Sequence, residues 1–371
     1  MTDRLRMIGY RARITPTAVV VAVCLVYVFG VLASTGGDPL TFALLGTRFS
    51  EGDPQGTEGY DGQFAYQIAL RPLGAAPYLD VPAYRYQRIL YPVLARLLAF
   101  GQPELIPWTL IALNIAAIGL GTWATESLLA DLGANRWYAL VYGLYGGQLM
   151  TLRTDLNEPL AQALVQGAML AWARERRWLS VVAFGLAVLS KETAMIFLAA
   201  YILYTLRCRR WKWSIALGMG AIPFVAYQFL LRAWLGEFGL GSGGAGATSF
   251  SLIPLGGWLE IIGVSMGAFL LISLIVVPMS VLPAIAGIIQ SVRELGRGGT
   301  HPVLFCLLLN SAVILFLPNS TFRELAAMVR LTQGLMVSML LYGALSSSSR
   351  VLNYSCLWVI TNVLLFKGVA G

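Results

Sequence analysis

The chain has 371 residues, of which 57% are hydrophobic and only 12% are charged. A soluble protein of this length would carry about a quarter charged residues, so the composition excludes a soluble globular domain and indicates a polytopic membrane protein. The net charge is +8, but the basic residues lie in short groups beside apolar stretches. Such groups are typical of topology signals and lipid anchors, and they argue against a nucleic-acid surface.

The apolar stretches predict one all-α transmembrane domain over residues 1–371, with about 11 spans in a range of 10–12. The N-terminus is expected in the cytoplasm because the first span follows Arg4, Arg6, Arg11 and Arg13. The expected spans are 15–34, 105–130, 136–151, 157–173, 178–190, 194–206, 214–232, 262–290, 302–318, 328–345 and 352–367. The stretch 262–290 contains two prolines and could be one kinked span or two segments.

Two larger loops are expected outside the cytoplasm. The first, 35–104, ends in an amphipathic segment, 88–100, whose apolar residues recur with helical spacing, so we expect it to lie on the outer membrane surface. The second, 233–258, is glycine-rich and is expected to be a flexible loop, since it follows no strand. The four cysteines have no paired spacing and the single histidine lies in a basic loop, so we expect neither disulfides nor a zinc site.

Five short groups of charged and polar residues fall on the outer side in this topology. A charge at the centre of a bilayer costs roughly 2.5–3.5 kcal/mol, so charges at the ends of apolar helices usually face water or one another. We therefore expect the five groups to converge on one outward-facing polar cavity. They are residues 58–63, 84–88, 153–158, 191–192 and 323–330.

Asp61 is the candidate catalytic residue in the first group. A carboxylate at the rim of a low-dielectric cavity has a raised pKa unless a cation compensates, and it can then act as a base. A simple turn aspartate is the alternative, because Asp61-Gly62 is a favoured turn pair.

The third and fourth groups supply further candidates for substrate binding. Arg153, Asp155 and Glu158 could bind sugar hydroxyls, and the two acids could hold Mg²⁺ or Mn²⁺, although no metal site is assigned. A cluster that only caps the following helix is the alternative. Lys191 and Glu192 lie between two short spans, where an adjacent lysine and glutamate at membrane depth favour a functional role.

Arginines on the outer side complete the candidate site. Arg85, Arg88 and Arg330 have the forked geometry that suits a phosphate group. Arg323 belongs to the same set. Membrane anchoring is the alternative for any one of them, because arginine side chains often extend from helix ends to the interface.

The order of these groups resembles that of the GT-C superfamily of integral-membrane glycosyltransferases, especially the class V mannosyltransferases of glycosylphosphatidylinositol synthesis and bacterial relatives of protein mannosyltransferases. Tyr60-Asp61-Gly62 resembles the catalytic W-D-G segment of the first outer loop, with Tyr60 in place of Trp. Residues 87–92 resemble the start of the surface helix that follows. Residues 153–158 resemble an R-x-D or S-E-S element, and residues 190–193 resemble a T-K-G-like element. The resemblance covers about residues 1–206.

This resemblance implies a glycosyltransferase of a bacterial inner membrane. The donor would be a polyprenyl-phosphate-linked monosaccharide, and an acceptor hydroxyl on an unknown glycan, lipid or protein would attack with inversion. Asp61 would be the general base, Arg85, Arg88, Lys191 and Arg330 would hold the phosphate, and Asp155 and Glu158 would orient sugar or acceptor.

Two other readings remain open from the sequence. A transporter or flippase of a lipid-linked or anionic sugar would use the same charges as a pathway, but it predicts repeated halves with broken helices, and no such symmetry is evident. A non-catalytic subunit of an envelope complex would use the charged groups only to pair with one another.

Overall fold

The computed structural model describes residues 14–244 and 246–364. About three quarters of the chain (75%) is helical, and the described residues contain no strand, so the predicted all-α class is confirmed. Arg4, Arg6, Arg11 and Arg13, on which the expected cytoplasmic N-terminus depends, lie outside the described residues.

Five helices in the described part of the chain are long and apolar enough to cross a membrane. Two shorter apolar helices, Arg177–Ser190 and Pro302–Leu315, accompany them. Large side chains such as Val26 and Phe29 are mostly exposed on the first helix, as expected for a surface that faces lipid. The five long helices are Pro16–Ser34, Pro103–Asp131, Trp211–Leu235, Met266–Gly296 and Leu325–Leu345.

Most helices of the membrane region begin and end close to the expected boundaries, whereas the expected span 352–367 is divided between α20 and a 3-10 segment at Cys356–Leu364. Pro16 and Pro159 lie in the first turns of α1 and α9, where the missing N–H group of proline costs no helical hydrogen bond. The bounds are α1 Pro16–Ser34, α6 Ile106–Asp131, α9 Glu158–Ala173, α10 Arg177–Ser190, α11 Met195–Arg207, α12 Trp211–Gly220, α13 Ile222–Leu235, α17 Pro302–Leu315, α18 Asn319–Arg323, α19 Leu325–Leu345 and α20 Ser349–Ser355.

One expected span, 136–151, is divided in the structure. It consists of a 3-10 turn at Arg136–Tyr138, α7 (Ala139–Gly143) and α8 (Gly146–Arg153). The break has its own hydrogen bonds, because the Tyr145 hydroxyl donates to the Val329 carbonyl and the Gly146 N–H donates to Thr361 Oγ1 at 3.1 Å. The Thr361 hydroxyl therefore satisfies a backbone N–H group at the break, and the Tyr145 side chain ties the break to α19.

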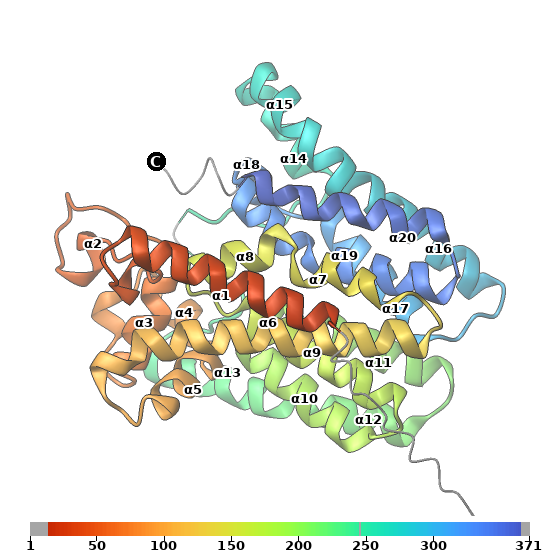
Figure 1. Ribbon diagram of the computed structural model, residues 1–371, viewed down its shortest axis with the longest axis horizontal. Helices are drawn as coiled ribbons and strands as arrows, with labels where there is room; N and C mark the ends of the chain where they lie inside the picture. Colours follow the sequence, from red (N-terminus) through yellow and green to blue (C-terminus); the bar gives the residue numbers. More distant parts are fainter. Residues whose placement is uncertain (1–13, 245, 365–371) are drawn as a thin grey trace, which may run out of the picture.

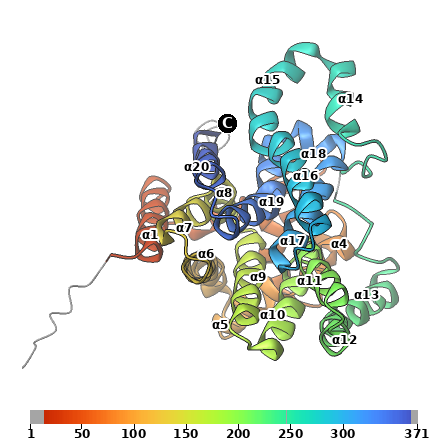
Figure 2. The same cartoon turned by 90° about the vertical axis from the view of Figure 1, so that its right-hand side faces the viewer.

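The stretch predicted as 262–290 forms two separate helical segments. α14 (Gly256–Val264) ends at Ser265, whose side chain caps the next helix by accepting from the Ala268 N–H. α15 (Met266–Val276) then continues through one π-helical turn, Val277–Val281, into α16 (Leu282–Gly296). α14 and α15 project from the body of the molecule (Figures 1 and 2).

Residues 35–104, the expected first outer loop, contain a layer of short helices at one end of the molecule (Figure 1, left). These are a 3-10 turn at Pro39–Thr41, α2 Thr47–Ser50, α3 Gly62–Leu70, a 3-10 turn at Ala76–Tyr78, α4 Pro82–Tyr86 and α5 Leu90–Leu98. The predicted amphipathic helix corresponds to α5, which buries Tyr91, Pro92 and Ala95 and leaves Leu97 and Leu98 exposed.

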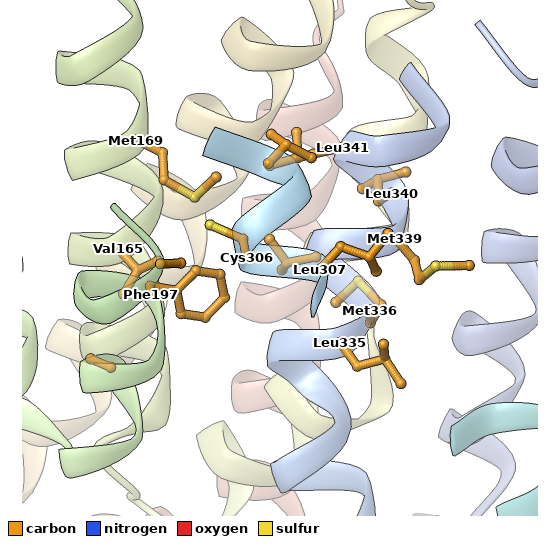
Figure 3. Close-up of a cluster of buried hydrophobic side chains, with 14 of the residues drawn as sticks. Val165, Met169, Phe197, Cys306, Leu307, Leu335, Met336, Met339, Leu340 and Leu341 are labelled. Atoms are coloured by element: carbon orange, nitrogen blue, oxygen red, sulfur yellow. The ribbon is translucent and has the colours of Figure 1, made fainter. Parts of the chain in front are cut away.

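A large apolar core joins the C-terminal helices to the middle of the chain. Figure 3 shows Phe197 of α11 and Leu307 of α17 directed toward Met336 and Leu340 of α19, and all four side chains are almost completely buried. This packing fixes α19 against α11 and α17. It therefore sets the position of the first turns of α19, which reach the layer of short helices.

Candidate functional site

The predicted convergence of the charged groups is confirmed. A cavity of about 220 Å³ lies between the layer of short helices, the starts of α9 and α11, and the start of α19. Its charged lining residues are Asp61, Arg85, Arg88, Glu158, Lys191, Glu192, Glu324 and Arg330.

Asp61 lies at the N-terminus of α3, where two arginines from different segments contact its carboxylate. Arg85 of α4 is 3.0 Å away and Arg330 of α19 is 3.3 Å away. Burial alone would raise the pKa of the Asp61 carboxyl, but these two guanidinium groups outweigh burial and hold the pKa well below its usual range. The compensating cations that the sequence left open are therefore present, and they favour the ionised form of Asp61.

Gly62 allows the Asp61 segment to reach the turn between α8 and α9. A Cβ atom at position 62 would lie 2.0 Å from the Thr154 carbonyl oxygen, so only glycine fits without a shift of the backbone. This close approach holds Asp61 beside the groups that follow Thr154.

Arg85 is held by a carboxylate that sequence reasoning did not single out. Its Nε and Nη2 atoms donate to the two oxygens of Asp80 at 2.6 and 2.7 Å, and its guanidinium lies 4.2 Å from the ring centre of Phe64. Asp80 lies five residues before Arg85 in a loop, and its sequence context gives no sign of this role.

Arg88 has a similar forked contact with Glu192. Its Nε and Nη2 atoms donate to the two Glu192 oxygens at 2.9 and 2.6 Å. Burial would raise the pKa of the Glu192 carboxyl, but Arg88 outweighs burial and lowers it to about 2. The ring of Tyr84 covers the guanidinium at 4.3 Å, and the Tyr84 hydroxyl accepts a further hydrogen bond from Nη2 at 2.6 Å.

Glu158 links the turn between α8 and α9 to the junction of α10 and α11, both of which border the cavity. One of its oxygens lies 2.5 Å from Lys191 Nζ and 3.6 Å from Arg330. The turn and the junction are tied together by the Asn157 side chain, which donates to the Ser190 carbonyl at 2.6 Å. Glu158 thus connects α9, the α10–α11 junction and α19 within the cavity.

Two expected site residues do not line this cavity. Arg153 donates to the Thr41 carbonyl at 2.6 Å and contacts the Phe42 ring, so it ties the first outer loop to α8. Asp155 is completely buried, and neither of its oxygens has a hydrogen-bond partner among the described residues. Burial raises the pKa of Asp155, against a weaker opposite effect of Arg153. Arg323, the further candidate cation, is exposed and also lies outside the lining.

Asp155 instead borders a small second cavity behind Asp61. This cavity has a volume of about 30 Å³ and is also lined by Asp61, Arg85, Arg88 and Tyr91. A space of this size with several polar walls is large enough for a water molecule. Asp155 therefore lines this second cavity and not the main cavity.

The charges around the main cavity nearly balance. Besides Asp61, Glu158 and Glu192, the carboxylates include Glu324, which accepts a hydrogen bond from the Tyr60 hydroxyl at 3.0 Å, and Asp80 on Arg85. Within the described residues, no group of three carboxylate, cysteine or histidine side chains is arranged to hold a metal ion. The cations form ion pairs with the acids, and a substrate with a negative charge must therefore compete with or share these contacts.

Comparison with protein-family models, curated proteins and solved structures finds no match for the chain. The residues of the cavity are therefore the basis for a functional proposal.

Proposed function

We propose that this protein is a membrane glycosyltransferase that resembles the GT-C superfamily. In this proposal it moves a monosaccharide from a polyprenyl-phosphate sugar to an acceptor hydroxyl on the outer side of a bacterial inner membrane. The observation that carries the proposal is that the charged cavity continues into an apolar cavity of about 270 Å³. The two cavities share Glu158, Lys191, Glu192, Arg330 and Leu331.

The apolar cavity suits a lipid chain. Its walls include Phe197 of α11, Val313 of α17, Leu317 just after α17, and Phe250 of the second outer loop. A ligand that fits both cavities has an anionic or polar head beside the cations and an apolar tail between helices. A lipid phosphate that carries a sugar has this combination, whereas a free sugar does not.

The chemistry of the proposed transfer uses Asp61 and the cations in separate roles. Asp61 accepts the proton of the acceptor hydroxyl, and the hydroxyl oxygen forms a bond to the anomeric carbon from the face opposite the phosphate. The bond between that carbon and the phosphate oxygen breaks, and its electron pair stays on the lipid phosphate. Arg88 and Lys191 stabilise the negative charge that develops there.

The membrane topology is part of the proposal. α9, α10, α11 and α17 are shorter than a bilayer-spanning helix but pack against the long helices. Together with the five long helices and the segments 136–151 and 352–367, they make up the proposed membrane domain of about 11 crossings. Residues 35–104 and the loop 233–258 then lie outside, where the cavity opens toward the acceptor.

The test is transfer of a radiolabelled sugar from its polyprenyl phosphate in proteoliposomes. Asp61→Asn keeps the shape of the side chain but removes the proton acceptor, and the rate should fall about 10²–10⁴-fold. Asp53→Asn is the matched control, because Asp53 is an exposed carboxylate of the same loop and an asparagine oxygen can still accept from the Gln55 N–H. Undiminished transfer by Asp61→Asn would exclude Asp61 as the base.

Transport of a lipid-linked or anionic sugar is the second candidate function. It is favoured by Gln162 and Gln166, which follow Glu158 at intervals of four residues along α9 and lead from the cavity into the helix bundle. Each has a buried amide atom without a partner among the described residues. Movement of an intact labelled substrate across proteoliposomes, without transfer to an acceptor, would favour transport over catalysis.

A further inference from the structure

The guanidinium of Arg88 donates two hydrogen bonds to Glu192, a carboxylate that itself lines the cavity. Both Arg88–Glu192 hydrogen bonds use the pair of N–H groups that a phosphate would use. We propose that Glu192 is an internal substitute for the donor phosphate, which holds Arg88 in the empty site and leaves it when a lipid phosphate binds. This inference rests on the proposed function, since it assumes that the phosphate binds at Arg88.

The position of Arg88 does not depend on Glu192 alone. Tyr84 covers the guanidinium with its ring, and its hydroxyl accepts a hydrogen bond from Nη2. Both contacts are made by Tyr84 and not by Glu192, so they remain when the Glu192 carboxylate moves away. The arginine is therefore already positioned for a second anion, and its ordering costs little when that anion binds.

Two other paired carboxylates of the site, Asp80 and Glu158, are less suited to exchange. Asp80 and Glu158 retain only 5% and 4% of their side-chain exposure, whereas Glu192 retains 17%. Arg85 also contacts Asp61 and Phe64, so its guanidinium is occupied on several sides. Glu192 begins a short 3-10 turn, Glu192–Ala194, and its carboxylate can move by side-chain rotation while α11 keeps its place.

An internal anion at this position lowers the affinity for an external one. Two negative groups cannot both occupy one guanidinium fork, so the binding of a phosphate includes the loss of the Arg88–Glu192 pair. Glu192→Gln removes the competing charge and keeps the length of the side chain. We expect the Kd for a lipid phosphate to fall about tenfold or more, in keeping with the strength of a charge-assisted hydrogen bond.

The experiment measures the Kd for a short polyprenyl phosphate without a sugar, in nanodiscs, by calorimetry. Glu324→Gln is the matched control, because it removes one carboxylate from the same cavity but contacts Tyr60 and Arg330 and not Arg88. Glu192→Gln should bind at least about three times more tightly than Glu324→Gln. Glu192→Asp, which keeps the charge but shortens the side chain, should bind with intermediate affinity. Thermal unfolding identifies any variant that is not folded.

Each other outcome overturns the inference in a distinguishable way. Equal or weaker binding by Glu192→Gln, with measurable binding by the unmodified protein, overturns the internal substitute and leaves the proposed donor class intact. Equal tightening by both glutamine variants shows a general effect of charge and also overturns it. No binding by any variant or by the unmodified protein overturns both this inference and the proposed lipid-phosphate donor.

Discussion

Asp61 and Arg330 lie 269 residues apart in the chain, and their side chains form an ion pair of 3.3 Å. The same guanidinium lies 3.6 Å from Glu158. Arg330 therefore joins the first outer loop, the start of α9 and the first turns of α19. The packing of α19 against α11 and α17 sets where this guanidinium lies, so the apolar core also determines the electrostatics of the cavity.

Removal of the Arg330 charge should loosen this junction. In Arg330→Gln we expect a lower thermal stability and a lower rate of transfer, because Asp61 and Glu158 then lose a shared cation. A double-mutant cycle with Asp61→Asn should give a coupling energy of about 0.5–3 kcal/mol, the range for residues in one ion-pair network. Additive effects of the two substitutions on unfolding would contradict the functional link between the two side chains.

The pH dependence of transfer should reflect the low pKa of Asp61. Burial would raise this pKa, but Arg85 and Arg330 outweigh burial and lower it, so the carboxylate stays ionised as the pH falls through the ordinary range for aspartate. A base must be deprotonated, and kcat/KM reports the free protein. We therefore expect kcat/KM to stay constant on the acid side down to about pH 4–5.

The same argument predicts in which direction the acid limb of kcat/KM moves in a variant. Arg330→Gln removes a cation that lowers the Asp61 pKa, so any acid limb should move to higher pH. The measurement is kcat/KM against pH for both proteins in the same liposomes. A limb near pH 7 in the unmodified protein would be incompatible with Asp61 as its source.

The sequence was sufficient to predict most of the charged residues of the cavity, but Arg153 and Asp155 were wrongly included and not all contacts were foreseen. The sidedness of the charged groups identified Asp61, Arg88, Glu158 and Lys191 as neighbours, because charges beside apolar helices must share an aqueous space. Asp80 was missed, since a carboxylate in a polar loop has no local signal that distinguishes an ion pair from full solvation. Asp155 was assigned to the cavity from helical spacing, but the left-handed backbone at this residue (φ 47°) is set by the tertiary structure.

The helix boundaries were also predictable only in part. α1, α9 and α10 were predictable because apolar composition and flanking charges act locally. The break at Tyr145 was not, because it depends on hydrogen bonds with Val329 and Thr361, which are distant in the sequence. Apolar content alone therefore predicts a continuous helix there.

The proposed topology makes a prediction about labelling in a variant without the four native cysteines. Single cysteines at positions 58 and 241 should react with an impermeant maleimide from outside, and those at 176 and 210 only after the membrane is opened. All four positions are exposed, so burial does not limit the reaction. Labelling of 58 and 176 from the same side would exclude the arrangement.

Asp155 should tolerate loss of its charge but not every change of shape. Burial raises its pKa and so favours the neutral form of the carboxyl, which Asp155→Asn imitates with a neutral amide. Asparagine also accepts the left-handed backbone. A β-branched residue does not, and Asp155→Val should lose about 1–3 kcal/mol of stability. Thermal unfolding of both variants tests this, and equal losses would contradict a neutral carboxyl.

Gly62 offers a test of how the position of Asp61 is maintained. Gly62→Ala places a methyl group 2.0 Å from the Thr154 carbonyl oxygen, so the two segments must separate. Because Asp61 immediately precedes this contact, the separation moves its carboxylate relative to Arg330 and Glu158. We expect transfer to fall at least about tenfold, since small displacements of a catalytic group have large effects on rate.

The control for Gly62→Ala is Gly74→Ala in the same loop. A Cβ atom at Gly74 has nothing within 4 Å, and this residue is exposed. The control should therefore keep both its stability and its rate of transfer, whereas Gly62→Ala should lose the rate. Membrane insertion should survive in both variants because neither residue lies in a long apolar helix. If Gly62→Ala transferred sugar at the rate of Gly74→Ala, the close approach to Thr154 would have no part in positioning Asp61.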